Sequence, residues 1–160
     1  MKIIKVENYR GVFDILVDNI FYDFIEYSNS VVSVNKNGYC YIRVMNKRYS
    51  LHRFVMNVSS KHVVDHINHN TLDNRKENLR LCSIQENVRN SIKHNSCKTS
   101  SKFKGVSFRV GRGLWRAYIS FNRKYIHLGH FNNEIDAAIA YNIKARDLFG
   151  EFACLNNIPQ

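Results

Sequence analysis

Acidic residues, paired cysteines and long apolar runs are scarce in this sequence of 160 residues. The four cysteines stand far apart without a Cys-x-x-Cys pair, which argues against a zinc-stapled fold and a disulfide framework and indicates reduced thiols. No apolar run approaches membrane-spanning length, and the N-terminus has no apolar core followed by a small-residue cleavage site. A nucleotide-binding glycine loop, a Ser or Cys nucleophile and internal repeats are also lacking. We therefore expect a cytoplasmic protein that is neither secreted nor membrane-bound.

The shortage of acids leaves a large and uneven positive charge. There are 24 Lys and Arg residues against 13 Asp and Glu, a formal net charge of +11. From Ser91 to His130, nine residues are Lys or Arg and none is acidic. Because neutralising phosphates releases condensed counterions, such an excess favours a polyanionic partner. A basic surface kept for solubility is the alternative, and the uneven distribution argues against it.

The most informative stretch spans residues 63–90. A short apolar strand ends in Asp65 and His66, a polar connector follows, and a second short strand is expected over 79–82. Such a connector is also compatible with a plain polar loop, in which Asp, Asn and His side chains cap backbone groups. The pair His69-Asn70 lies in mid-connector, and we do not count it as part of the pattern.

A helix is expected to open at Ser83, because Glu86 three residues later completes a capping box. Asn87 then falls in its first turns. Together the spaced residues suit phosphodiester hydrolysis, in which a neutral imidazole takes a proton from water. A carboxylate and an amide oxygen are hard ligands for a magnesium-like ion, which needs few protein ligands.

The stretch resembles the HNH nuclease motif in its His-Asn-Asn form, found in homing endonucleases of phage and intron origin. Asp65-His66, Asn78 within Glu-Asn-Leu-Arg, and Asn87 within Glu-Asn-Val-Arg-Asn carry the resemblance. It implies that His66 is the general base and that Asn78 holds the loop and the base in place. It implies Asp65 and Asn87 as ligands of a divalent metal ion, Mg²⁺ or Mn²⁺, with Asn90 as the alternative to Asn87.

Residues 1–58 are expected to form a small β-rich part. Strands are expected at 3–6, 12–17, 31–34, 39–44 and 48–51, with a short helix over 18–27. The pair His52-Arg53 resembles a recurrent pair of phage HNH proteins. We expect a structural role for His52. Arg53 is compatible with a phosphate contact and equally with a surface or loop-ordering role.

Residues 94–102 are polar, basic and Ser-rich and predict a linker. A second module follows, with antiparallel strands over 103–108, 114–121 and 124–128. A helix over 134–149 is expected to begin at Asn132 or Asn133 and to end at Gly150. Trp115 is expected in the core between the sheet and this helix.

This module resembles the apetala-type DNA-binding domain of plant ethylene-response factors. The matching pieces are FKGV, WRAYIS, HLGHF and AAIAYNIKARDLFGEFACLN. In that family the exposed sheet face enters the major groove, which implies DNA-facing positions at Lys104, Ser107, Arg109, Tyr118, Ser120, Tyr125 and His127.

Phosphate contacts are expected from Arg116, Arg123 and Lys124, and Arg109 can reach a guanine edge. Several DNA-facing positions hold Ser, Tyr or His where the family has Arg, Glu or Trp, so its sequence preference does not transfer. Tyr118 and Tyr125 are equally compatible with cross-strand packing.

The sequence predicts an α+β chain with a β-rich part (1–58), a ββα-metal HNH nuclease core (59–93), a basic linker (94–102) and an apetala-type DNA-binding domain (103–160). In the last, a three-stranded antiparallel sheet packs on one helix. We expect a metal-dependent, site-directed endonuclease that acts as a monomer on double-stranded DNA and nicks one strand. Its setting would be the cytoplasm of a bacterial host if it is phage-encoded. A DNA-binding regulator with an inactive nuclease centre is the alternative, and an RNA-binding accessory protein is disfavoured because clustered stacking aromatics are lacking.

Overall fold

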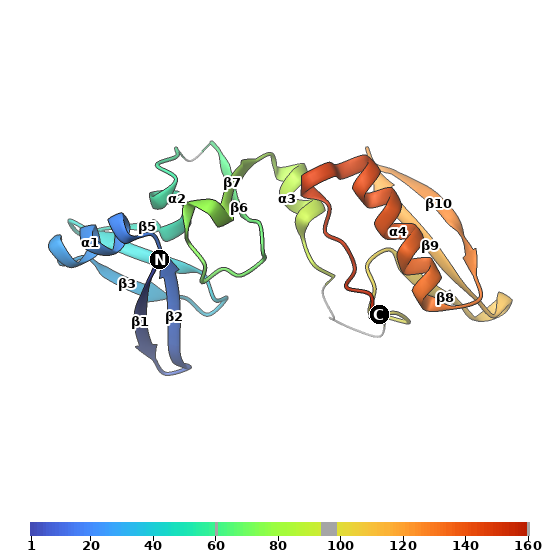
Figure 1. The fold of residues 1–160 in the computed structure, drawn as a ribbon, viewed down its shortest axis with the longest axis horizontal. Coiled ribbons are helices and arrows are strands. Elements are labelled where there is room, and N and C mark those ends of the chain that lie inside the picture. The colour runs from blue at the N-terminus through green and yellow to red at the C-terminus, as the bar shows by residue number, and fades with distance from the viewer. Residues whose placement is uncertain (60, 94–98, 160) are drawn as a thin grey trace. The chain divides into compact units, whose positions relative to one another are not determined.

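The computed structural model describes residues 1–59, 61–93 and 99–159. Its helices and small antiparallel sheets confirm the predicted α+β class. The chain divides into two compact units, residues 1–87 and 88–160, drawn from blue to green and from green to red in Figure 1. Cys97 and residues 94–98 of the predicted linker lie outside the described residues.

The first unit begins with a hairpin of β1 (Lys2–Asn8) and β2 (Gly11–Val17), followed by α1 (Asn19–Tyr27). Next comes an antiparallel sheet of β3 (Val31–Val34), β4 (Cys40–Val44) and β5 (Lys47–Ser50), and then α2 (Leu51–Val55). The unit is completed by β6 (Val63–His66), the 3₁₀ turn η1 (Lys76–Asn78), β7 (Leu79–Cys82) and the start of α3 (Ile84–Asn90). The helix α3 continues across the boundary into the second unit.

The strands of this unit occur where the sequence predicts them, within one or two residues at each end. The short helix α2 was not predicted. The strand expected over 48–51 ends at Ser50, and Leu51 opens a helix instead. Leu51 and Val55 are both buried, one turn apart, so this turn of helix places two apolar side chains in the core.

One apolar core joins the predicted β-rich part to the predicted nuclease segment. Ile15 and Val17 from β2 and Leu51 from α2 are fully buried, and Val64 and Leu79 pack into the same cluster from β6 and β7. The β6–β7 hairpin therefore shares its apolar core with the N-terminal strands.

The connector between β6 and β7 is fastened to β2 through its backbone. The Leu16 amide donates to the Leu72 carbonyl (2.9 Å), and the Asn74 amide donates to the Leu16 carbonyl (2.8 Å). The Thr71 hydroxyl also donates to the Gly38 carbonyl (2.8 Å). These bonds fix the position of the connector, whose composition alone predicts only a polar loop.

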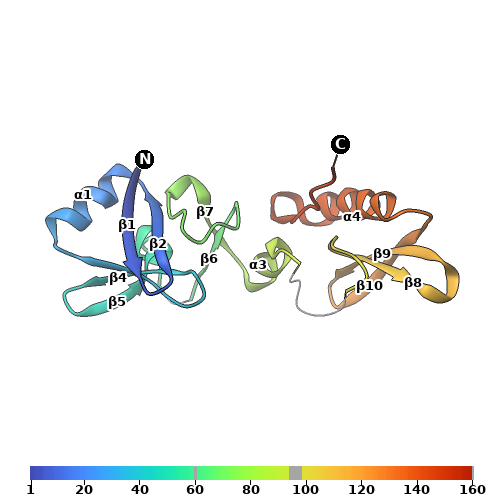
Figure 2. The same ribbon diagram turned by 90° about the horizontal axis from the view of Figure 1, so that it is seen from below.

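The second unit holds β8 (Val106–Arg109), the 3₁₀ turn η2 (Val110–Arg112), β9 (Leu114–Phe121), β10 (Lys124–Phe131), α4 (Glu134–Phe149) and η3 (Gly150–Phe152). Its three strands form an antiparallel sheet in the order β10-β9-β8. Figure 2 shows α4 lying along one face of this sheet. The strand expected over 103–108 begins only at Val106. Phe103 is buried in the core instead, and the Lys104 amide donates to Asn156 Oδ1 (2.6 Å).

Small residues let α4 approach the sheet closely. Ala117 on β9 and Ala138 and Ala145 on α4 are fully buried. At Gly105, whose φ is +72°, a Cβ would lie 2.1 Å from the ring of Tyr141, so this position requires glycine. The helix begins as predicted at Asn133, whose Oδ1 accepts from the Asp136 amide.

The described part of the predicted linker packs against the second unit. Lys93 Nζ donates to the carbonyls of Ser101 (2.8 Å) and Phe103 (2.9 Å), and the Ser100 hydroxyl accepts from the Phe108 amide. Residues 99–102 are therefore held by specific bonds.

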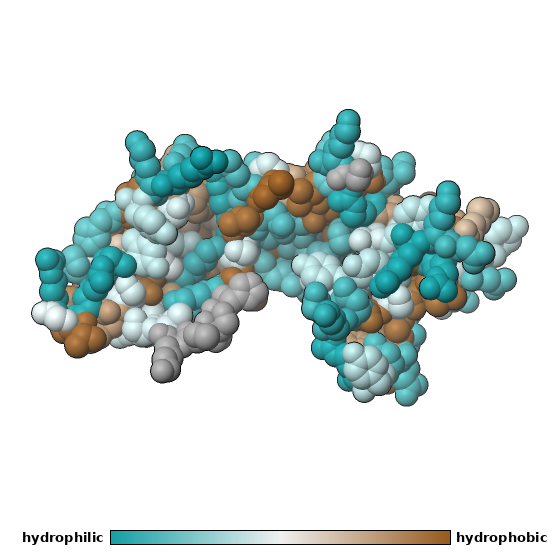
Figure 3. Space-filling view, turned by 180° about the vertical axis from the view of Figure 1, so that it is seen from behind, coloured by the Kyte–Doolittle hydropathy of each residue, from teal (hydrophilic) through white to brown (hydrophobic). Residues whose placement is uncertain are grey.

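Hydrophilic residues cover most of the face seen in Figure 3, with apolar residues in small separate groups. Among the described residues, no helix is both long enough and apolar enough to cross a membrane.

Candidate functional site

His66 ends β6 and is buried, with only 6% of its surface exposed. In the β6–β7 ladder Asp65 lies opposite Arg80 and His66 opposite Leu79. Successive residues of a strand point to opposite faces, so the side chains of Asp65 and His66 lie on opposite sides of the hairpin.

The imidazole of His66 is packed among aromatic rings from the first 58 residues. The ring centroid of His52, on α2, lies 5.2 Å away, and that of Tyr39 lies 6.4 Å away, both in edge-on arrangements. His52 and Tyr39 also contact each other, at 6.1 Å. This packing restricts the orientation of the His66 ring.

Burial keeps both imidazoles neutral. It lowers the pKa of His66, while a hydrogen bond with Asn74 and the carboxylates of Asp65 and Asp73 oppose that effect. Burial also lowers the pKa of His52 to about 4, and the nearby His66 and Arg53 add to the shift. At neutral pH the His66 ring is therefore able to accept a proton.

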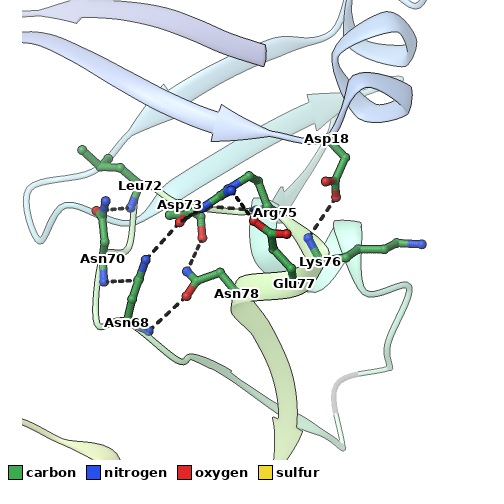
Figure 4. A network of polar contacts seen from close by, with 9 residues as sticks. All are labelled: Asp18, Asn68, Asn70, Leu72, Asp73, Arg75, Lys76, Glu77 and Asn78. Carbon is green, nitrogen blue, oxygen red and sulfur yellow. Dashed lines mark hydrogen bonds and ion pairs between the residues drawn. The ribbon is translucent and has the colours of Figure 1, made fainter. Parts of the chain in front are cut away.

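Asn78 fastens the connector, as Figure 4 shows. It is buried, its Oδ1 accepts from the Asn68 amide (3.0 Å), and its Nδ2 donates to the Asp73 carbonyl (2.8 Å). The Ile67 amide, next to His66, donates to the Asn78 carbonyl (2.9 Å). Asn78 thus ties the residue after His66 to the far end of the loop.

A second buried centre of the loop is Asp73, which is 1% exposed. Its carboxylate accepts from Arg75 Nε and Nη2 (both 2.8 Å) and from Asn68 Nδ2 (3.0 Å). Arg75, the largest cause, holds the pKa of this carboxyl below its usual range. The Asp73 carboxylate therefore stays charged and paired within the loop.

Asp65 and Asn87 lie around the thiol of Cys82. Asp65 Oδ2 accepts from Arg80 Nε (3.0 Å) and Nη2 (2.9 Å). Burial raises the pKa of the Cys82 thiol, and Asp65 and Glu86 raise it further, while a hydrogen bond from the Asn87 backbone opposes the shift. Asn87 itself is exposed near the start of α3.

The capping box that places Asn87 is present as predicted. The Glu86 amide donates to Ser83 Oγ (3.2 Å), and the Ser83 amide donates to Glu86 Oε2 (2.7 Å). The start of α3 is therefore fixed locally by its own side chains.

The chemistry of Asp65 and Asn87 fits a hard divalent cation. One carboxylate and one amide oxygen are ligands that Mg²⁺ and Mn²⁺ accept alongside water. Within residues 1–59, 61–93 and 99–159, no group of three or more His, Cys, Asp or Glu side chains is arranged to hold a metal ion. Arg80 is a competing cation for Asp65, so ion binding there requires the Arg80 guanidinium to share or yield Oδ2.

Arg53 orders a loop in this structure. Its Nη1 donates to the His62 carbonyl (2.6 Å), and its Nη2 donates to the Ser59 carbonyl. The phosphate contact that the sequence leaves open for Arg53 stays a prediction.

In the second unit, the alternation predicted for β9 is present. Ala117 and Ile119 are buried, while Ser120 on the opposite face is exposed. Trp115 packs on the core side against Phe108, at 5.0 Å between ring centroids. The open face of the sheet carries the predicted DNA-facing side chains Ser107, Arg109, Arg116, Tyr118, Ser120, Tyr125 and His127.

Three other predicted DNA contacts lie elsewhere in this unit. The Lys104 ammonium donates to the carbonyls of Arg89 (2.8 Å) and Ser91, which engages it within the fold. Arg123 and Lys124 are exposed at the β9–β10 turn, where Asn122 (φ 49°) and Arg123 (φ 62°) have the left-handed conformation of a tight hairpin.

Sequence reasoning did not single out Asp73, Arg112 or His130, and it gave His52 only a structural role. The Asp-x-Arg spacing of Asp73 and Arg75 is a usable local signal for an ion pair. His52 reaches His66 only through the tertiary fold. His130 joins the open sheet face through a strand irregularity that alternation does not predict.

Two comparisons with known proteins bear on this site. Residues 57–89 match the family model described as HNH endonuclease. The chain is also 35% identical, over 131 residues, to a protein of Acanthamoeba polyphaga mimivirus named as an uncharacterized HNH endonuclease. That match covers 78% of this chain and 66% of the relative, slightly under two thirds of its length.

Proposed function

We propose that this chain is a metal-dependent nuclease that hydrolyses a phosphodiester bond of double-stranded DNA, because residues 57–89 match the HNH endonuclease family model. The observation that carries the proposal is the buried, neutral His66, fixed between His52 and Tyr39 beside a loop that Asn78 fastens. A general base must be unprotonated at the working pH and held in a fixed orientation, and a buried, packed imidazole meets both conditions.

His66 acts as the base that removes a proton from the attacking water. Its ring keeps a defined orientation through His52 and Tyr39, so little reorganisation is needed when the substrate arrives. Asn78 acts through His66, since it ties the residue that follows the base to the connector. It is a positioning residue.

Asp65 and Asn87 would hold the divalent ion, which when bound stabilises negative charge on the phosphate and leaving oxygens. Asp65 is buried and forms an ion pair with Arg80, whereas Asn87 is exposed at the start of α3. We propose that Arg80 holds Asp65 in place and shares it with the ion.

The open sheet face of the second unit supplies DNA binding. It presents Arg109, Arg116 and His127 on one side of a rigid sheet, while α4 and the core take the other side. Cations at the turn, Arg123 and Lys124, extend the charged surface. This surface meets the backbone phosphates, with Arg109 placed to read a base edge.

A single Asp65–His66–Asn78–Asn87 set addresses one scissile phosphate at a time. We propose that a monomer nicks one strand, leaving a 5′-phosphate and a 3′-hydroxyl, and that the enzyme is of the site-directed, phage homing type. Strand-specific end-labelling tests this. Equal and concerted cutting of both labelled strands at low enzyme concentration, with a dimeric mass in solution, would contradict it.

Incubation with supercoiled plasmid tests the nuclease proposal. The purified chain should relax the plasmid with Mg²⁺ or Mn²⁺ and not with a chelator, and His66→Ala should abolish relaxation. His69→Asn is the matched control, because His69 is an exposed histidine of the same connector at φ 63°, a conformation that Asn tolerates. Binding without cutting by the wild-type chain would instead show a DNA-binding regulator with an inactive centre.

A further inference from the structure

A β-bulge in β10 changes which side chains line the open face of the second unit's sheet. The pairing of β10 with β9 skips one residue between His127 and Gly129. Gly129 has φ +138°, where a Cβ would lie 3.1 Å from the Phe131 ring, so the bulge depends on glycine. Because the alternation shifts by one residue, His130 lies on the same face as His127, with ring centroids 4.6 Å apart.

These two histidines line a groove of about 720 Å³ together with Arg109, Arg112 and Arg116. We call these five residues the bulge groove. They come from β8, η2, β9 and β10, so the groove depends on the whole sheet and not on one loop. The other residues that line the groove are uncharged, and its described lining contains no carboxylate.

Arg116, which lines the groove, and its cross-strand neighbour Ser107 carry buried polar atoms that the fold does not satisfy. Arg116 Nε and Ser107 Oγ, from residues paired across β8 and β9, are buried and find no hydrogen-bond partner among the described residues. A buried N–H without an acceptor is costly and calls for an explanation. An anion bound in the groove gives the Arg116 guanidinium the acceptor that the fold does not provide, once the buried Nε turns toward the groove.

The charges around His130 favour the same kind of ligand. Its pKa is lowered first by burial and then by His127, Arg112, Arg109 and Arg116, which face it from β10, η2, β8 and β9. An anion among these cations would oppose their repulsion and favour protonated imidazoles. Anion binding and proton uptake are therefore linked, and the affinity should rise as the pH falls.

We propose that the bulge groove binds one phosphate group of the DNA backbone, with His127 and His130 as proton-dependent partners of its oxygens. The proposal rests on the proposed DNA binding and adds Arg112 and His130 to it. Guanidinium forks suit phosphate oxygens, and a groove with three arginines beside two imidazoles gives one phosphate a defined place along the sheet.

The test measures binding of a fluorescein-labelled 30-base-pair duplex by the full chain, by fluorescence anisotropy in a chelator so that no cutting occurs. Wild-type affinity should rise by about three- to tenfold from pH 7.5 to pH 6, as expected when up to one proton is taken up per phosphate bound. The double variant His127→Gln/His130→Gln should lose this pH dependence and keep its affinity at pH 8 within about twofold.

Arg112→Ala should weaken binding and lower the slope of log K against log salt by about 0.9, the loss of one phosphate contact. Arg146→Ala is the matched control, since it removes an equal charge from an exposed position on α4, away from the sheet face. Its slope should stay that of the wild type. Equal slopes for Arg112→Ala and Arg146→Ala, or an unchanged pH dependence in the histidine variant, would overturn the proposal.

Two further arms separate the alternatives. Inorganic phosphate added at constant ionic strength should compete poorly with the duplex, and strong competition lost in the histidine variant would assign the groove to free phosphate. The failure of the chain to cut plasmid leaves the binding result intact, because binding is read in a chelator. If the wild type binds DNA and the variants bind it with the same affinity, salt slope and pH dependence, the groove proposal alone is rejected. If the wild type does not bind DNA, both the groove and the proposed DNA surface are rejected.

Discussion

The connector of the first unit and the open sheet face of the second unit differ in how their charged and amide side chains are paired. In the first, Asp73 and Asn78 are buried, and residues of their own loop hydrogen-bond them. In the second, Arg109 and Arg112 are exposed, and the buried Nε of Arg116 finds no partner among the described residues. The connector completes the hydrogen bonds of Asp73 and Asn78 internally, although His52 Nδ1 and Asn74 Oδ1 nearby are buried without a partner among the described residues. The sheet face of the second unit leaves a cationic surface to be completed by a partner.

This difference assigns the geometry of the candidate catalytic site to the first unit and the affinity for DNA to the second. A satisfied buried network holds a base such as His66 in place before any substrate binds, which is what preorganised catalysis requires. An open cationic face gains its energy when it meets a polyanion and loses it as salt is added. Variants of the first unit should therefore change cutting or folding, and variants of the second should change binding.

The largest expected effect is on cutting by His66→Ala. Removal of the base should lower the rate by about 10²–10⁴-fold or more, while duplex affinity in a chelator stays within about twofold, because the charged surface is untouched. Single-turnover cleavage and anisotropy on the same preparation measure the two effects. A loss of affinity matching that of a sheet-face arginine variant would contradict the separation of roles.

The next effect is on stability, through Asn78→Ala. The change leaves the Asn68 amide and the Asp73 carbonyl without their partner and should lower the free energy of unfolding by about 2–3 kcal/mol. Asn70→Ala is the control in the same loop, since Asn70 is exposed and its side chain accepts from the Leu72 amide, a bond between neighbouring turn residues. Urea unfolding compares the two. Equal losses would show that Asn78 does not fasten the loop.

The local features of both units could be predicted from the sequence. The capping box of Ser83 and Glu86, the Asn133 cap and the alternation along β9 each depend on residues close in the chain. The connector has the local turn contacts that the loop interpretation predicts, whereas the roles predicted for its site residues stay predictions. Asn70 and Asp73 form local turn contacts there, while Asn78 carries the connection toward His66.

The features that were missed depend on distant parts of the chain or on a shift in strand register. The contact of His52 with His66 brings α2 against β6 and has no local signature. The place of His130 follows from the bulge at Gly129, since strict alternation puts residue 130 on the core side. Lys104 was expected on the DNA face, but the carbonyls of Arg89 and Ser91 engage its ammonium, a contact that only the folded chain creates.

A smaller effect is expected from Arg109→Ala, on binding alone. If Arg109 reads a base edge, duplex affinity should fall by about 1–3 kcal/mol, and cutting at saturating protein should be nearly unchanged. Titrations against a cognate and a scrambled duplex separate base reading from charge, with Arg146→Ala as the control for lost charge. An equal loss on both duplexes would assign Arg109 to a phosphate instead of a base.

The smallest effect concerns acid stability and His52. The folded-state pKa of His52 is about 4, below the ordinary value of 6.5, so the unfolded chain binds more protons between these values. The contribution of neutral His52 to the free energy of unfolding is therefore fully present above pH 6.5 and is lost as the pH falls toward 4. Since the ring is only partly shielded from solvent, we expect a loss of about 1–2 kcal/mol, less than the pKa difference alone would give.

His52→Phe isolates this contribution, because it keeps a ring against His66 and removes the ionisable group. Its unfolding free energy should fall less than that of the wild type between pH 7 and pH 5, while His69→Asn, which removes an exposed imidazole, should follow the wild type. Urea unfolding at each pH measures the difference. Parallel pH curves for His52→Phe and the wild type would mean that the first unit does not hold His52 neutral. The neutral state of the buried His52 and His66 rings would then no longer be a difference between the first unit and the exposed cationic surface of the second.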